Sequence, residues 1–141
     1  PHFYNYALMK ALNAGKQMTD VWQIPAIGKW EKSCGKHPTQ KPIAVLSRLI
    51  QASTKPNAWI LDPFSGSATT GIAANLLGRR YLGLEMEESF LSMSKARREE
   101  LENITIRQSY IERLQKGNHI LSYNALSFAE EPESDYSAPW F

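Results

Sequence analysis

The hydrophobic positions of the chain form two short apolar runs, each followed by a stretch with helical spacing. The first run, residues 58–61, ends in the carboxylate Asp62, and residues 70–77 follow it with apolar positions on one helix face. This pattern predicts a buried strand, a tight turn and a helix. The second run, residues 81–84, ends in Glu85. It predicts a second strand that also ends in a carboxylate.

Further helices are predicted on either side of these strands. Residues 88–101 carry an apolar face and a polar face, and Arg97 is assigned to the polar one. Residues 43–52 predict a helix with Pro42 in its first turn and Arg48 on its outer side. The alternation of strands and helices favours an α/β fold with a mostly parallel sheet, flanking helices and right-handed crossovers.

The remaining segments give weaker predictions. Residues 3–12 predict a helix that stops near Gly15, and residues 21–24 predict a sheltered strand. Elsewhere, residues 104–115 fit a strand followed by a helix, residues 119–123 fit a further strand, and the acidic residues 130–141 fit a loose tail. We therefore expect one domain over residues 1–129, followed by the tail.

Composition narrows the class of protein. A chain of 141 residues with 43% hydrophobic content can form one core, and its net charge of +2 permits a nucleic-acid partner without requiring one. The single Cys34 excludes an intramolecular disulfide and fits the reducing cytosol, so we expect a cytoplasmic protein. No apolar run approaches the roughly 18 residues of a membrane span. The chain begins with Pro1 rather than Met, so we expect a fragment or a processed piece.

A basic segment surrounds residues 28–35, where Lys29, Lys32 and Lys36 accompany Trp30. Such a segment can contact nucleic-acid phosphates, but charged runs are more often solvated faces. We favour a solvated loop. The three histidines and Cys34 lack the spacing of metal ligands, so no metal site is expected.

The two strand-end carboxylates suggest a ligand site. In an open parallel sheet, ligands bind at the carboxyl ends of the strands, and a carboxylate about 20 residues past a glycine-containing turn can accept both hydroxyls of a ribose. Glu85 is therefore a candidate ribose ligand, and Asp62 a candidate partner for an amino group. A dinucleotide is disfavoured, because Ala68 stands where the second glycine of the phosphate-binding pattern would fall.

Three ordered motifs resemble those of DNA amino-methyltransferases. Residues 62–70 read Asp-Pro-Phe-Ser-Gly-Ser-Ala-Thr-Thr and resemble the S-adenosylmethionine-binding motif of that family, with Ala68 in place of its usual glycine. Residues 37–42, His-Pro-Thr-Gln-Lys-Pro, are similar to the motif that precedes it in a permuted subgroup. Residues 79–85 resemble the strand that follows it. The resemblance implies a partial Rossmann-like, S-adenosylmethionine-dependent methyltransferase fold.

The resemblance also implies roles for individual residues. Glu85 would hold the ribose, Met86 would lie beside the adenine, and Lys41 would oppose the methionine carboxylate. The full set of cofactor-binding residues implied is Thr39, Gln40, Lys41, Asp62, Pro63, Phe64, Gly66, Ser67, Thr69, Thr70, Glu85 and Met86. If position 68 needs a positive φ angle, Ala68 costs about 1 kcal/mol there.

The family's catalytic motif, Asp/Asn/Ser-Pro-Pro-aromatic, does not occur in the sequence, so no catalytic residue is assigned. In the permuted subgroup, the catalytic and DNA-recognition parts precede the His-Pro-Thr motif. We therefore expect the C-terminal, cofactor-binding piece of an enzyme that methylates adenine N6 or cytosine N4 in double-stranded DNA. This piece would be inactive without the missing N-terminal part. The alternative is a non-catalytic nucleic-acid-binding or assembly module that keeps the fold.

Overall fold

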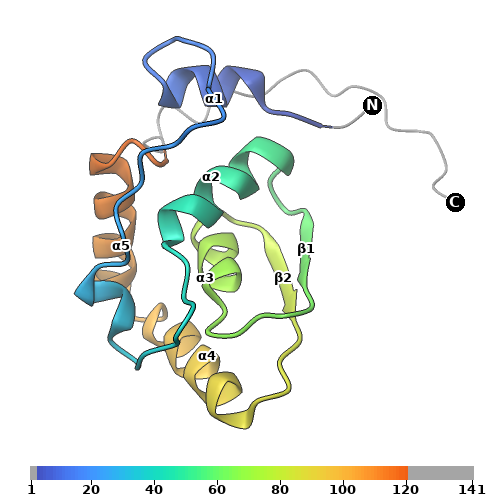
Figure 1. Cartoon of the computed structure of the whole chain (residues 1–141), viewed down its shortest axis with the longest axis vertical. Coiled ribbons are helices and arrows are strands. Elements are labelled where there is room, and N and C mark those ends of the chain that lie inside the picture. The colour runs from blue at the N-terminus through green and yellow to red at the C-terminus, as the bar shows by residue number, and fades with distance from the viewer. Residues whose placement is uncertain (1–2, 121–141) are drawn as a thin grey trace, which may run out of the picture.

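The computed structural model describes residues 3–120, which form eight elements: two parallel strands and six helices. Figure 1 shows their arrangement. In chain order the elements are α1 (Tyr6–Leu12), the 3-10 helix η1 (Lys29–Lys32), α2 (Ile43–Ser53), β1 (Trp59–Asp62), α3 (Thr69–Leu76), β2 (Arg80–Gly83), α4 (Glu88–Glu100) and α5 (Ile104–Lys116).

The sheet contains the two strands that the apolar runs predict. β1 pairs with β2 in parallel, with Trp59 opposite Arg80 and Asp62 opposite Gly83. α3 connects them, and it ends just before Gly78, whose φ of +69° suits a residue past a helix end. The prediction of an α/β fold with parallel strands is therefore confirmed, with the strand bounds shifted by about one residue.

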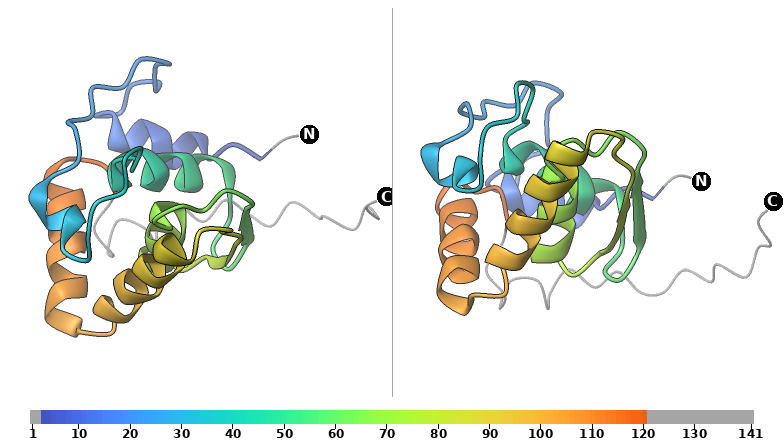
Figure 2. Two further views of the ribbon diagram at one scale, coloured as in Figure 1. Left: turned by 60° about the horizontal axis from the view of Figure 1, so that its bottom comes forward. Right: turned by 90° about the horizontal axis from the view of Figure 1, so that it is seen from below.

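Only one face of the sheet is covered by the described residues. Ile60 and Tyr81 pack against the hydrophobic core, whereas four large apolar side chains of the other face are more than half exposed. These four are Trp59, Leu61, Leu82 and Leu84. Figure 2 shows the helices lying to one side of the two strands. The prediction of a fully buried strand is thus wrong for alternate residues, because successive side chains point to opposite faces.

The core lies between the sheet, α2, α3 and α5, and two glycines allow its close packing. The ring of Tyr81 lies so near Gly71 and Gly83 that a Cβ atom at either position would overlap it. Burial and the nearby carboxylate of Asp62 raise the pKa of Tyr81 to about 12. A glycine within α3 is therefore explained by the aromatic side chain that packs on it.

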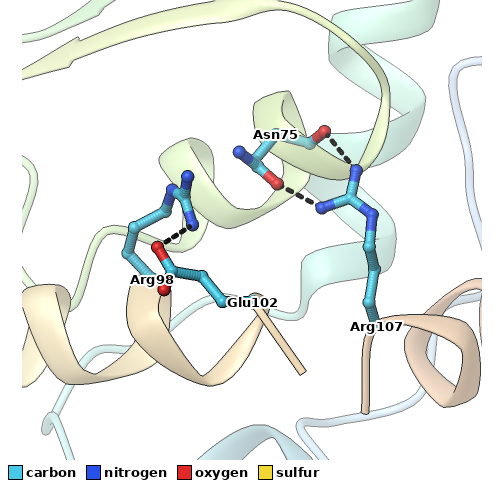
Figure 3. A network of polar contacts seen from close by, with 4 residues as sticks. All are labelled: Asn75, Arg98, Glu102 and Arg107. Atoms are coloured by element: carbon cyan, nitrogen blue, oxygen red, sulfur yellow. Dashed lines mark hydrogen bonds and ion pairs between the residues drawn. The ribbon is translucent and has the colours of Figure 1, made fainter. Parts of the chain in front are cut away.

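One arginine joins α5 to α3. Arg107 donates from Nη1 to the Asn75 side-chain oxygen (2.5 Å) and from Nη2 to the Asn75 carbonyl oxygen (3.0 Å), as Figure 3 shows. The same view contains the ion pair of Arg98 and Glu102, at 3.6 Å on the exposed side of α4. Arg107 thus links two helices, whereas Arg98 is paired only with a residue four positions later in the chain.

The structure corrects three sequence-based predictions. Residues 21–24 form no strand, and Val21 is exposed, because no other described strand pairs with them. The segment from residue 104 is helical from its first turn, since the Asn103 side chain caps α5 by accepting from the N–H groups of Thr105 and Ile106. The polar segment at residues 28–35 contains η1 rather than loop alone.

Two arginines predicted on polar helix faces are buried. Arg48 contacts His119 (3.4 Å) and lies over the ring of Trp22, and Arg97 lies inside the protein. Of the predicted strand at residues 119–123, only residues 119 and 120 are described, and neither is in a strand. The predicted tail at 130–141 lies outside the described residues. Among residues 3–120, no helix is long and apolar enough to cross a membrane.

Candidate functional site

Asp62 organises the turn that follows β1. Its Oδ1 accepts a hydrogen bond from the Phe64 backbone N–H (3.2 Å), and its Oδ2 accepts one from the Thr70 hydroxyl (2.7 Å). One carboxylate thus fixes both the start of the turn and the first turn of α3. Both of its oxygens keep a lone pair for a further donor.

The turn contains two residues in the left-handed conformation. Gly66 has φ +51°, and Ala68, the residue before α3, has φ +53° and ψ +37°. The sequence analysis left open whether position 68 needs a positive φ, and the structure shows that it has one. Alanine disfavours this region by about 1 kcal/mol, because its Cβ approaches the following carbonyl oxygen.

Glu85 lies at the end of β2 and contacts the turn directly. Its Oε2 accepts from the Gly66 N–H at 2.7 Å, and its Oε1 accepts from the Glu87 N–H at 2.9 Å. The N–H groups of Glu87, Gly66 and Met86 lower the pKa of Glu85. The carboxylate is therefore ionised and held in one orientation at the carboxyl edge of the sheet.

His37 brings the His-Pro-Thr-Gln-Lys-Pro segment to the same turn. A Cβ atom built on Gly66 would lie 2.9 Å from the His37 Nε2, so the ring rests directly on the glycine. The ring also packs against Phe90 with centroids 4.2 Å apart, and its Nδ1 accepts from the Thr39 N–H (3.3 Å). Three segments that are separate in sequence thus meet at Gly66.

The rest of that segment is held by Glu31, which the sequence analysis did not single out. The Glu31 carboxylate is 4% exposed and accepts from the N–H groups of Ile43 (2.8 Å) and Gly28 (3.3 Å). The Gln40 side chain donates to the Glu31 carbonyl oxygen (2.7 Å). The Gln40 amide nitrogen is therefore used within the protein, whereas Thr39 and Lys41 are exposed.

Ser67 and Thr69 face a second unpredicted residue, Arg97. Both are buried, and both hydroxyls accept hydrogen bonds from the Arg97 Nη1. A signal for Arg97 was present in the sequence: it lies seven residues after Phe90 and four before Leu101, the spacing of one helix face. These two predicted site residues hold the turn together through their side chains.

Large apolar side chains lie exposed around the carboxyl edge of the strands. Phe64 is 90% exposed and Met86 is fully exposed, and Pro63 beside them is exposed as well. Together with Glu85, they form an open surface that offers an aligned carboxylate next to apolar contact area. Such a surface suits a ligand with a diol and an aromatic or aliphatic part.

Other chemistries find little support among the described residues. No three His, Cys, Asp or Glu side chains in residues 3–120 lie close enough to hold a metal ion. Burial raises the pKa of the Cys34 thiol, which lies beside Ser33 and Glu100. A raised thiol pKa does not favour a nucleophile.

Comparison with known proteins places these features in context. A family model described as DNA methylase (N6_N4_Mtase) matches residues 3–96. The chain is 58% identical over 101 residues to Type II methyltransferase M2.MboI of Moraxella bovis, a match that covers 72% of this chain and 37% of that protein. It is 55% identical over 98 residues to M2.DpnII of Streptococcus pneumoniae, covering 70% and 37%. The chain thus spans little more than a third of the length of these relatives.

Comparison with a solved structure shows the fold. The PvuII DNA methyltransferase, described as cytosine-N4-specific, superposes with a TM-score of 0.53 at 22% identity, over 79% of this chain and 41% of that one. The similarity confirms the predicted Rossmann-like methyltransferase fold. The bounds of the predicted domain and tail stay predictions.

Proposed function

Because the chain belongs to the DNA methylase family N6_N4_Mtase, we propose that it forms the cofactor part of an enzyme that methylates DNA. The reaction is transfer of a methyl group from S-adenosylmethionine to an exocyclic amine, adenine N6 or cytosine N4. The observation that carries the proposal is the meeting of three motifs at Gly66, which donates its N–H to Glu85 and leaves no room for a Cβ atom beside the His37 ring.

The side chains present at the turn fit S-adenosylmethionine. Glu85 is ionised, aligned by two N–H groups and partly exposed, so it can accept hydrogen bonds from both ribose hydroxyls. Met86 and Phe64 offer apolar surface to the adenine and the methionine chain. When bound, the cofactor supplies an activated methyl group.

The charged ends of the cofactor have candidate partners as well. Asp62 can accept from the amino group, since both of its oxygens have spare lone pairs. Lys41 is exposed, and its ammonium can oppose the carboxylate of the methionine part. Three other side chains make hydrogen bonds within the protein: Ser67 and Thr69 accept from Arg97, and Gln40 donates to Glu31. We therefore assign them a positioning role and not a binding role.

We propose that a further polypeptide segment supplies the catalytic groups and covers the bare face of the sheet. Parallel sheets are normally covered on both faces. Here Trp59, Leu61, Leu82 and Leu84 form an apolar face whose side chains are each more than half exposed among the described residues, with the Arg80 guanidinium over the Trp59 ring. A segment carrying the Pro-Pro-aromatic motif and docking on this face would complete both the fold and the active site.

DNA is the proposed substrate, and the segment around η1 offers contacts for its phosphates. Lys29, Lys32 and Lys36 lie on the surface, whereas the carboxylate of Glu31 among them is turned inward. The surface of this segment is therefore cationic without a neutralising carboxylate of its own. Since His37 in the same segment rests on Gly66, DNA bound there would lie beside the cofactor turn.

A chimera tests the proposal. The matched region of M2.MboI is replaced by the corresponding residues of this chain, and transfer of tritiated methyl from S-adenosylmethionine into DNA is measured. Mass spectrometry of the digested nucleosides then identifies the methylated base. We expect transfer to adenine N6 or cytosine N4 that is lost in Glu85→Gln. A folded chimera that binds DNA but transfers no methyl group would contradict the proposal and favour the non-catalytic binding module.

A further inference from the structure

Arg97 contacts both residues that flank Ala68 in the turn between β1 and α3. Its Nη1 donates to the Ser67 carbonyl oxygen (2.6 Å), to the Ser67 Oγ (3.2 Å) and to the Thr69 Oγ1 (3.1 Å). The arginine is only 3% exposed, and its two partners are buried as well. The turn is therefore tied from inside the protein on both sides of its alanine.

The turn needs such contacts, because its backbone is unfavourable. Gly66 and Ala68 both have positive φ, and alanine disfavours this conformation on steric grounds. The N–H of Ala68 is bonded to the Ser65 carbonyl oxygen at 2.7 Å, and the N–H of Gly66 to Glu85. Ser67 lies between these two hydrogen-bonded residues. A change at Ser67 or Thr69 would therefore shift the Gly66 N–H that donates to the Glu85 carboxylate.

Stability alone does not account for a guanidinium at this position. Burial lowers the pKa of Arg97, and its Nε and Nη2 have no hydrogen-bond partner among the described residues. A buried charge with unmet donors contributes little net stability, and well-packed apolar residues often do better. What Arg97 supplies is one nitrogen, Nη1, held within hydrogen-bond distance of three acceptors of one turn.

We propose that Arg97 is a positioning residue for the cofactor site, acting through the conformation of residues 66–69. It holds Ser67 and Thr69 so that the Gly66 N–H points at Glu85 and the Gly66 Cα faces His37. The inference rests on the proposed function, because it assigns the turn to S-adenosylmethionine. The residues whose side chains are proposed to bind the cofactor are not among the hydrogen-bond partners of Arg97, which are Ser67 and Thr69.

Native-state hydrogen exchange of the 141-residue chain tests the positioning role without any ligand. The variant is Arg97→Met, and the matched control is Arg98→Met, the next residue on α4, which has only an exposed ion pair. We expect Arg97→Met to speed exchange at the Gly66 and Ala68 amides about tenfold more than in the middle of α2, with no such change in the control. Equal acceleration at all amides would show a merely structural role and overturn the inference.

Binding of S-adenosylhomocysteine, followed by NMR titration, gives the second readout. We expect Arg97→Met to weaken binding about tenfold, since it removes the donor of all three contacts to Ser67 and Thr69. Thr69→Val keeps the buried cation and removes one acceptor, so it should act in the same direction if Arg97→Met does not fold. Unchanged affinity in Thr69→Val, or in a folded Arg97→Met variant, would overturn the inference.

Failure of the proposed function would look different. If the wild-type chain binds no S-adenosylhomocysteine, the cofactor assignment fails for this chain. The exchange rates at Gly66 and Ala68 still decide whether Arg97 sets the conformation of the turn.

Discussion

The Glu85 carboxylate and the Gly66 N–H, 19 residues apart in sequence, are joined by a hydrogen bond of 2.7 Å. The bond connects the end of β2 to the turn after β1, and Ser65 and Leu84 continue the pairing beside it, with a backbone bond of 2.9 Å. The two strand-end motifs therefore form one rigid unit before any ligand is present.

This bond makes the turn sensitive to acid. The N–H groups of Glu87, Gly66 and Met86 lower the pKa of Glu85, so its contribution to stability is complete above the ordinary glutamate pKa and is lost as pH falls through the lower, folded-state value. We expect the Gly66 amide proton shift to titrate with a midpoint below that of a glutamate in an unstructured peptide. NMR measurement of this shift against pH checks it, and a midpoint at or above the peptide value would contradict it.

Ala68 should be a stabilising site for glycine. Ala68→Gly relieves a φ of +53°, so the free energy of unfolding should rise by about 1 kcal/mol, less what is lost by removing a buried methyl group. The matched control is Ala73→Gly, the same change at a fully buried position inside α3, which should lower stability by about 1 kcal/mol or more. Urea unfolding of both variants provides the measurement. A loss of stability in Ala68→Gly comparable to that in the control would show that the turn is not strained.

The sequence predicts β1, β2, the helices beside them and the carboxylates of the site, because these depend on local patterns. Two strands are predicted by the apolar runs before Asp62 and Glu85. The end of α3 is predicted by the glycine that follows it, Gly78.

Side chains that link distant segments are not predictable in this way. Arg97 and Arg48 are charged, so a polar helix face is the natural assignment, yet both are buried against residues far away in sequence. Glu31 caps α2 from 12 residues away, and no local pattern encodes that contact. Ser67 and Thr69 were assigned to the cofactor for their place in a motif, whereas their hydroxyls face Arg97.

The two arginines of Figure 3 should differ in their effect on stability. Arg107→Ala removes two hydrogen bonds between α5 and Asn75 of α3, so it should lower the free energy of unfolding by about 1–2 kcal/mol. Arg98→Ala removes only the exposed pair with Glu102 and should cost less than about 0.5 kcal/mol. Thermal and urea unfolding measure both. Equal losses would mean that the Asn75 contact does not join the helices in solution.

The lysines around η1 should dominate the salt dependence of DNA binding. Replacing Lys29, Lys32 and Lys36 by glutamine should lower the slope of log affinity against log salt by up to about 3. The control replaces three exposed lysines elsewhere, Lys10, Lys16 and Lys116, and keeps the overall charge change the same. Fluorescence anisotropy with a labelled duplex measures both slopes. The same reduction of the slope in the two variants would show that DNA binding depends on the net charge of the chain and not on this surface.

The central claim is that Glu85 and the turn at Gly66 bind S-adenosylmethionine. An NMR titration of the 141-residue chain with S-adenosylhomocysteine tests it most directly, because chemical shifts detect weak binding and locate it. The claim predicts saturable shifts confined to residues 62–70 and the neighbourhood of Glu85. These shifts should be absent in Glu85→Gln and retained in Glu88→Gln, a change of the same kind at an exposed residue at the start of α4. Saturable binding that Glu85→Gln leaves unchanged, or no saturable shift in the wild-type chain, would contradict it.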